Sequence, residues 1–431
     1  MKPALSSRNW FMPGLGVKRW IVLVILGVIL LTAGLTFSVL GLYARQAPQL
    51  PYLPLGLIAL LLLAGVASIS IAVFGLSRAI LAPYRVNQPG AVLDVVYDHS
   101  RRGRGPRIVA IGGGTGLPAT LRALKPYTSN LTAVVTVADD GGSSGRLRKE
   151  LGVLPPGDLR NNIAALADDE KLMTRLFQHR FTGGALGGHA FGNLFISALA
   201  GVTGSLESAL IEAGRVLNIQ GQVFPATLDD VELTAEIRLN GQLITVRGES
   251  RITAANGHIE QVALQPPAAA GFTGSVEAIR AAEMVIVGPG SLYTSILPNL
   301  LVREIAQALR TTSALKVYVC NIATQPGETT GYNVAEHVEA IERVLGENVL
   351  HVIVANSSFQ TENAGENTFY VTPVPDDHPL RQRYRLISTD LVEYERPWRH
   401  DPAKLAAVLL SLHEARHAPV SPATEQDIVL Q

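Results

Sequence analysis

The stretch Ile108–Leu117, with the sequence IVAIGGGTGL, decides the fold that we expect for this chain. Four apolar residues typical of a buried β-strand lead directly into a glycine-rich turn. Pro118 follows at a position that suits the first turn of a helix. Bare glycine amides can approach an anion closely, and the N-terminal end of a helix favours negative charge. We interpret this unit as the phosphate end of a nucleotide site, built from Gly112, Gly113, Gly114, Thr115, Gly116 and Leu117.

This interpretation has alternatives. Glycine also serves a tight strand-to-helix turn that binds nothing. Leu117 stands where the dinucleotide fingerprint has its third glycine, and no Gly-Lys-Ser/Thr follows as in a Walker A loop. An NAD-binding oxidoreductase is therefore disfavoured. The phosphate interpretation requires two things of the backbone amides after Ile111. Side chains must not occupy them, and they must face the cleft at the carboxyl ends of the strands.

Two long apolar stretches precede this body, at residues 21–43 and 53–76, and neither carries a charge. Each is longer than the ~20 residues needed to cross the hydrocarbon core of a bilayer. Basic residues precede the first stretch and follow the second, whereas Arg45 alone lies between them. The positive-inside rule therefore predicts a two-pass anchor over residues 1–81 with both termini in the cytosol. Its lack of charges favours an anchor over a transporter, and its glycines, Gly27, Gly34, Gly41, Gly56 and Gly65, are suited to close helix packing.

The rest of the chain alternates strand-like and helix-like segments. This pattern predicts an α/β fold with a Rossmann-like, mostly parallel sheet and helices on both faces. We expect a linker over residues 82–106, a cytosolic domain over 107–418 and a flexible tail over 419–431. Residues 223–264 alternate apolar and polar residues around two Asn-Gly pairs, at 240–241 and 256–257, which predicts an inserted β-meander. The meander would form a lobe or an oligomer contact, and we expect a homo-oligomer.

Composition excludes some classes of protein. The formal net charge is zero, which gives no support to a nucleic-acid partner. The single cysteine, Cys320, excludes an intrachain disulfide and fits a reducing compartment. It follows apolar residues, so we expect a buried strand thiol.

Polar loops follow several of the expected strands. Because ligands bind at the carboxyl ends of parallel strands, these loops are expected to converge on one cleft. After the strand at 131–138, paired aspartates are suited to accept ribose hydroxyls or to hold a divalent ion, and the serines to cap a helix or bind phosphate. Asp158 fits a helix cap, although its polar neighbours favour a further role. The candidates are Asp139, Asp140, Gly141, Gly142, Ser143, Ser144, Asp158, Arg160, Asn161, Asn193, Gly288, Pro289, Gly290, Ser291, Tyr293, Thr294, Asn321, Thr324 and Gln325.

Six stretches together resemble the gluconeogenesis factor family, which is itself similar to 2-phospho-L-lactate transferase. They are residues 112–117, 137–148, 155–161, 188–194, 288–301 and 324–329, in consistent order within residues 107–404. The resemblance implies a bacterial protein that binds UDP-sugars such as UDP-N-acetylglucosamine and that cell shape and wall synthesis require during growth on gluconeogenic carbon. The resemblance also implies cell-wall synthesis or carbon-metabolism proteins as partners. It does not include the two apolar stretches, which by themselves predict a location in the cytoplasmic (inner) membrane with membrane lipid as a partner.

The resemblance also assigns roles within the site. The glycine turn would meet the diphosphate, with Asp139 and Asp140 beside it, and Arg399 matches a position implicated in UDP-sugar binding. Because no nucleophile and base stand at a recognisable spacing, we expect a binding regulator without turnover. The alternative is a metal-dependent transferase that acts on a nucleotide-activated phospho-donor, with Mg²⁺ on Asp140 and Asp158.

Overall fold

The computed structural model describes residues 18–44, 54–81, 100–168, 170–359 and 368–417. The chain divides into two compact units, Met1–His99 and Ser100–Gln431. Most of the expected linker and the whole expected tail lie outside the described residues.

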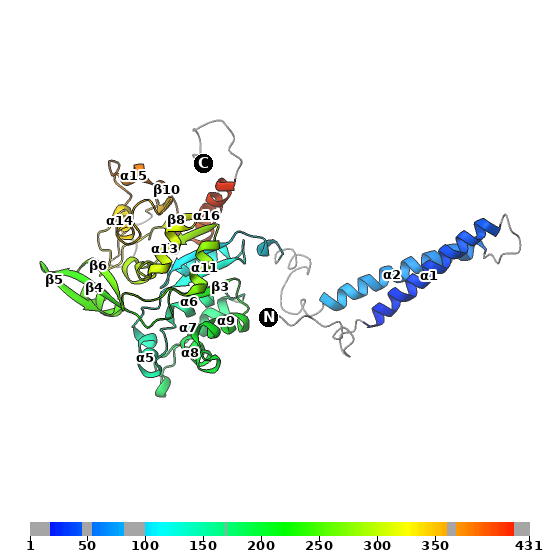
Figure 1. Ribbon diagram of the computed structural model, residues 1–431, viewed down its shortest axis with the longest axis horizontal. Coiled ribbons are helices and arrows are strands. Elements are labelled where there is room, and N and C mark those ends of the chain that lie inside the picture. The colour runs from blue at the N-terminus through cyan, green and yellow to red at the C-terminus, as the bar shows by residue number, and fades with distance from the viewer. Residues whose placement is uncertain (1–17, 45–53, 82–99, 169, 360–367, 418–431) are drawn as a thin grey trace. The chain divides into compact units, whose positions relative to one another are not determined.

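The first unit contains two helices, α1 (Lys18–Ala44) and α2 (Leu55–Leu81), which pack side by side. Both are long and apolar enough to cross a membrane (Figure 1). A Cβ atom on Gly27 would lie 3.0 Å from the Gly65 carbonyl oxygen, so the backbones meet where side chains are absent. Gly34 lies against Leu62, whereas a Cβ atom on Gly41 or Gly56 would meet nothing within 4 Å. Close packing by glycine is thus confirmed for Gly27, Gly34 and Gly65 but not for the other two.

The second unit is built on a seven-stranded sheet in which every pairing is parallel. The strand order is β10-β9-β8-β7-β1-β2-β3. This arrangement confirms the predicted α/β class. The strands are β1 (Ile108–Gly112), β2 (Leu131–Val135), β3 (Gln222–Pro225), β7 (Met284–Val287), β8 (Leu315–Val319), β9 (Val352–Asn356) and β10 (Arg385–Thr389).

Helices connect these strands and cover the sheet (Figure 1). One group contains α4, which packs against α6 and α16, and another contains α13, which packs against α11 and α14. Crossover connections between parallel strands are right-handed. The connections from β1 towards β3 and those from β7 towards β10 run in opposite directions along the sheet, so their helices lie on opposite faces. The helices are α4 (Leu117–Leu124), α5 (Gly142–Leu151), α6 (Gly157–Leu166), α7 (Glu170–Gln178), η3 (Gly184–Leu186), α8 (Phe191–Thr203), α9 (Leu206–Val216), α11 (Thr273–Ala281), α12 (Leu297–Leu300), α13 (Arg303–Thr311), α14 (Val334–Leu345), α15 (Leu380–Arg383) and α16 (Pro402–His417).

The insert is a three-stranded antiparallel sheet of order β5-β4-β6. Its elements are β4 (Glu232–Leu239), β5 (Gln242–Arg247), α10 (Glu249–Ala255) and β6 (His258–Gln265). Asn240 and Gly241 have positive φ angles and form the predicted hairpin turn. The second prediction is wrong, because Asn256 ends helix α10 with a φ of 50° and does not join two strands. The insert also begins later than expected, since residues 222–225 form β3 of the main sheet.

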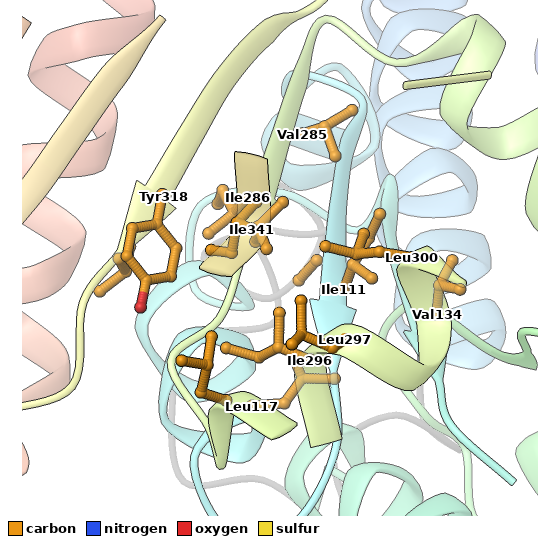
Figure 2. Close-up of a cluster of buried hydrophobic side chains, with 14 of the residues drawn as sticks. Ile111, Leu117, Val134, Val285, Ile286, Ile296, Leu297, Leu300, Tyr318 and Ile341 are labelled. Atoms are coloured by element: carbon orange, nitrogen blue, oxygen red, sulfur yellow. The ribbon is translucent and has the colours of Figure 1, made fainter. Parts of the chain in front are cut away.

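The core lies where β1 and β7 meet the segment that follows β7. Ile111 and Ile286 lie on these neighbouring strands, and Leu297 and Leu300 of α12 approach them (Figure 2). All four side chains are buried. Truncating such a side chain to alanine costs about 2–5 kcal/mol, so this cluster fixes the base of the loops described next.

Candidate functional site

The loops after β1 and β7 meet at the topological switch point of the sheet. The chain runs outward from β1 through β2 to β3, then returns to β7 on the other side of β1 and continues to β10. A crevice at the carboxyl ends of β1 and β7 is where open α/β sheets bind ligands. The loops after β1, β7 and β8 line one cavity, as expected, whereas the loop after β2 does not reach it.

Glycine is required where the two loops touch. A Cβ atom on Gly116 would lie 2.5 Å from the Pro289 carbonyl oxygen, closer than real Cβ contacts allow. Gly114 has a φ of 60°, which side chains rarely adopt. From α12, the buried amide of Asn299 donates to the Gly112 carbonyl at 3.0 Å. The glycine loop is thus held from two sides, and Leu117 belongs to the core.

Asp158 occupies one amide of this loop. Its Oδ2 accepts a hydrogen bond from the Gly114 N–H at 2.7 Å. The predicted capping role is wrong, because α6 begins after Pro156 with no side-chain cap. Burial, partly offset by the Gly114 hydrogen bond, raises the pKa of Asp158 to about 6. A side chain of the protein itself therefore occupies part of the proposed phosphate cradle, so the expectation that these amides are free of side chains is wrong at Gly114.

Asp139 is the acidic neighbour of Asp158, while Asp140 has another partner. The negative charge of Asp139 contributes to the raised pKa of Asp158. Asp140 instead accepts the Ser250 amide at 2.9 Å, at the start of α10 in the insert. The predicted pair of Asp140 and Asp158 is thus not brought together by a contact in the structure, whereas Asp139 is close enough to Asp158 to affect its pKa. Among the residues that the structure describes, no group of three or more acidic, histidine or cysteine side chains is arranged as a ready metal site.

Glu249 completes an acidic surface beside the glycine loop. Burial, followed by the charges of Asp139, Asp158 and Glu328, raises the pKa of Glu249 well above its usual range. A carboxyl among like charges retains its proton unless a cation compensates them. The chemistry of these donors therefore suits a divalent cation, which prefers carboxylate oxygens.

The serines after Asp140 face a buried network and not solvent. Ser143 Oγ lies 3.2 Å from His189 Nδ1 and accepts the Asn193 side-chain amide at 3.1 Å. Asn193 also donates to Ser144 at 3.3 Å. All four residues are buried, which matches an internal pairing of the starts of α5 and α8. The nearby Arg160 donates to Asn161 at 3.0 Å, and burial followed by the charge of Arg180 lowers its pKa.

The loops after β7 and β8 are locked together by side-chain amides and a carboxylate. Asn321 accepts from the Gly290 N–H at 2.9 Å and donates to the Gly290 carbonyl at 2.8 Å. Glu328 accepts from Thr294 at 2.9 Å and from Gln325 at 2.9 Å. Burial raises the pKa of Glu328. Several predicted ligand residues therefore hold one another, which positions the loop that follows Pro289.

A cavity of about 1190 Å³ opens beside these loops. The predicted residues in its wall come from the loops after β1, β7 and β8 and from β12: Thr115, Gly116, Pro289, Gly290, Ser291, Asn321, Thr324, Gln325 and Arg399. The other predicted site residues lie outside this wall, namely Gly112, Gly113, Gly114, Leu117, Asp139, Asp140, Gly141, Gly142, Ser143, Ser144, Asp158, Arg160, Asn161, Asn193, Gly288, Tyr293 and Thr294.

A basic wall, of which the sequence analysis predicted only Arg399, also lines the cavity. It consists of Arg122, Lys171, Arg175, Arg396 and Arg399, and Glu393 is the acidic residue in the lining. Lys171, Thr174, Arg175 and Gln178 are spaced as one face of α7. That spacing can be seen in the sequence. It does not predict a binding site, however, because polar helix faces of this kind usually face solvent. The surplus of positive charge makes the cavity suitable for an anion.

Arg396 and Arg399 reach the cavity from a hairpin of β11 (Val392–Glu393) and β12 (Arg396–His400). Burial, followed by the charge of Arg396, lowers the pKa of Arg399. The next residue, His400, donates from Nε2 to the Cys320 carbonyl at 3.1 Å. Burial lowers the pKa of His400 to about 4, so this ring is neutral and fixes β12 beside β8. Cys320 is buried, as predicted.

Comparison with known proteins identifies relatives over most of the chain. A family model described as 2-phospho-L-lactate transferase CofD matches residues 108–395. The Bacillus subtilis protein named gluconeogenesis factor is 42% identical over 316 residues, which cover 72% of this chain and 99% of that one. A crystal structure of an upf0052 family protein from Bacillus halodurans shares 41% identity with a TM-score of 0.66, covering 71% of this chain and 99% of the other.

A relative from Nostoc sp. extends further. It is 44% identical over 438 residues, which cover 95% of this chain and 93% of the relative. Only about 5% of this chain lies outside the match, which is less than the length of the two apolar helices, so the match must include most of them. The N-terminal unit is therefore shared with at least this relative and absent from the region matched in Bacillus subtilis.

Proposed function

This chain belongs to the gluconeogenesis factor family, and on that premise we propose that its switch-point cavity binds a sugar nucleotide as a regulatory ligand. UDP-N-acetylglucosamine is the ligand that we assign to it. In this proposal the chain reports the supply of that precursor to proteins of cell-wall synthesis or carbon metabolism, as a homo-oligomer, and has no turnover of its own.

The observation that carries this proposal is that one cavity is lined both by the loops at the switch point and by the basic wall. Gly116 and the loop from Pro289 to Ser291 supply part of the lining, and the five basic side chains supply another part. A diphosphate carries the charge that such a wall attracts, and a volume of about 1190 Å³ is ample for a nucleotide with its sugar. Arg399 would bind the phosphate or the sugar end, because guanidinium groups bind oxyanions through two parallel hydrogen bonds.

Titration calorimetry on the full chain in detergent tests this proposal. We expect UDP-N-acetylglucosamine to bind and Arg399→Ala to weaken binding by about tenfold or more, since a charge-assisted hydrogen bond contributes about 1.5–3 kcal/mol. Arg215→Ala is the matched control, because Arg215 on α9 is exposed and pairs with Glu212 outside the cavity. Absence of heat at millimolar ligand would reject the proposal.

A second candidate is a metal-dependent transferase, and the carboxylates around Asp158 favour it. In this mechanism an acceptor hydroxyl attacks the distal phosphorus of a nucleotide-activated donor. The new P–O bond forms as the bond to the nucleoside monophosphate breaks, and the hydroxyl proton leaves to a base. Asp139 and Asp158 would hold Mg²⁺, which supplies charge neutralisation when bound. Magnesium-dependent release of nucleoside monophosphate from donor and acceptor would place this function above the first.

The location that we propose is the bacterial cytoplasmic membrane, with α1 and α2 as a two-pass anchor and the large unit in the cytosol. The length and apolar character of both helices support it. Labelling of intact cells tests the orientation. A cysteine introduced by Gln49→Cys is expected to react with a membrane-impermeant maleimide, whereas one introduced by Ser7→Cys is not. The reverse pattern would overturn the assignment.

A further inference from the structure

A second cavity, of about 410 Å³, lies outside the switch-point cleft. Its wall comes from β6 of the insert and from three helices, α12, α13 and α14. The apolar lining residues Val262, Leu297 and Leu300 are buried, whereas the lining arginines Arg303, Arg310 and Arg343 are exposed. The cavity therefore has an apolar floor and a basic rim.

Two of the three arginines that line this second cavity, Arg310 and Arg343, carry its positive charge, because Arg303 forms an ion pair with Glu304 at 3.2 Å. Glu260 already forms an ion pair with Arg238 at 2.7 Å, which lies outside the lining. Arg310 donates to the carbonyls of Leu345 and Val344 at 2.8 and 2.9 Å. These carbonyls hold the guanidinium in place at the end of α14 without neutralising its charge. An anion of the ligand would therefore meet a positioned cation, which reduces the entropy cost of binding.

Tyr293 provides the polar group at the inner end. Its hydroxyl lies 2.9 Å from the Tyr332 hydroxyl and 3.5 Å from Arg343 Nη2. Together with the side-chain amide of Gln261, it can exchange hydrogen bonds with ligand hydroxyls. The combination of arginines, neutral hydrogen-bonding groups and an apolar floor is suited to a small hydroxylated phosphate ester.

One short segment joins both cavities. Pro289, Gly290 and Ser291 line the switch-point cleft, and Tyr293 and Leu297 line the second cavity. Tyr293 belongs to the π-helical turn η4 (Leu292–Ile296), which directly follows Ser291 and leads into Leu297. Turns of this type occur mostly as short insertions and are frequent at functional sites. A ligand that holds Tyr293 would therefore bias the loop that lines the cleft.

We propose that the second cavity is an effector site for a small phosphorylated polyol, which adjusts the switch-point cleft through η4. The binding part of this proposal is independent of the proposed function, and the coupling part depends on it. Coupling requires that the effector binds two conformations of η4 with different affinity.

Calorimetry of the full chain with glycerol 3-phosphate tests binding, and glycerol serves as the uncharged control. We expect Arg343→Gln to weaken glycerol 3-phosphate binding by about tenfold, as for loss of a charged hydrogen bond. Arg396→Gln, a variant of the basic wall, is expected to leave it within about twofold, because an exposed charge outside the second cavity contributes little to its ligand. Loss of binding in Arg396→Gln alone would place the phosphate in the switch-point cleft and overturn the proposal, as would the absence of binding at millimolar ligand.

The coupling is measured as the affinity for UDP-N-acetylglucosamine with and without saturating glycerol 3-phosphate. We expect a change of about fivefold or more, which Arg343→Gln abolishes. An unchanged affinity would reject the coupling while leaving the effector site intact. If the sugar nucleotide fails to bind under both conditions, the proposed function fails and the glycerol 3-phosphate result still decides the second site.

Discussion

The carboxylate of Asp158 accepts the Gly114 amide at 2.7 Å, across 44 residues of sequence. A side chain thus holds a place that the glycine loop offers to a phosphate. Because burial raises the pKa of Asp158 to about 6, its charge changes near physiological pH. A ligand phosphate must therefore either displace this carboxylate, meet it in its protonated form, or share a cation with it.

The first prediction concerns the pH dependence of ligand binding. Without divalent metal, protonation of Asp158 removes its repulsion of a phosphate, so sugar-nucleotide affinity is expected to fall as pH rises above 6. The affinity can fall by at most about tenfold for each pH unit, because binding takes up one proton. Asp158→Asn is expected to flatten this profile between pH 5 and 8 in calorimetric titrations. A pH-independent affinity in the wild-type chain would contradict this competition.

The same titration in Mg²⁺ tests whether a cation binds at Asp158. A metal held by Asp139 and Asp158 needs ionised carboxylates, so metal-dependent binding is expected to strengthen as pH rises through about 6. Asp158→Asn would then abolish the effect of Mg²⁺. Identical profiles with and without the metal would argue against a cation at this position.

The second prediction concerns His400 and folding stability. Burial lowers its pKa from 6.5 to about 4, so the unfolded chain binds the proton more readily than the folded one. Stability from the neutral ring is therefore present above pH 6.5 and is lost as pH falls towards 4, by at most about 3 kcal/mol. His400→Gln is expected to remove this part of the acid sensitivity in urea unfolding followed by circular dichroism. An equal loss of stability in both proteins between pH 7 and 4 would refute it.

The third prediction compares two glycines of the same loop. Gly116→Ala places a methyl group 2.5 Å from the Pro289 carbonyl oxygen, so the loops after β1 and β7 must separate. We expect a loss of about 1–3 kcal/mol in unfolding free energy, together with weaker ligand binding. Gly112→Ala is the control, because its methyl group would meet nothing closer than 3.6 Å. Similar stability of the two variants would show that the loop contact adapts.

The fourth prediction concerns the helix pair of the first unit. Gly27→Val is expected to separate α1 from α2, because its Cβ would meet Ile69 Cγ1 at 2.6 Å. Gly41→Val is the control, since nothing lies within 4 Å of that position. Proximity can be measured by cross-linking cysteines from Leu23→Cys and Ser68→Cys, at positions where the Ser68 hydroxyl lies 2.8 Å from the Leu23 carbonyl. Equal cross-linking in both glycine variants would exclude a packing role for Gly27.

Local sequence patterns correctly predicted strands and turns whose conformation is determined by neighbouring residues. The strand predicted before the glycine-rich turn is β1, and the Asn-Gly pair at 240–241 forms the predicted hairpin turn. The Asn-Gly pair at 256–257 gave a wrong prediction for a physical reason. Both a hairpin turn and a helix end need a residue with positive φ, so the pair alone does not distinguish them.

The candidate site was predicted only in part, because its contacts are long-range. The sequence around Asp158 does not indicate its hydrogen bond to Gly114. An aspartate near the start of a helix is most often a cap. The basic wall combines residues of α4, α7 and β12, and their convergence depends on the folded sheet. Glycine loops at strand ends are recognisable from sequence, whereas the basic residues that line the same cavity become apparent only in three dimensions.

The hydrogen bond from His400 to the Cys320 carbonyl has a consequence for the order of events during synthesis. The glycine loop leaves the ribosome early, but β12, which carries two arginines of the basic wall, leaves nearly 300 residues later. A nascent chain can therefore pair its first strands without possessing a complete ligand pocket. If the cavity binds the proposed ligand, that ligand is expected to stabilise only molecules that have been translated past His400, so truncated products would gain no such protection from degradation.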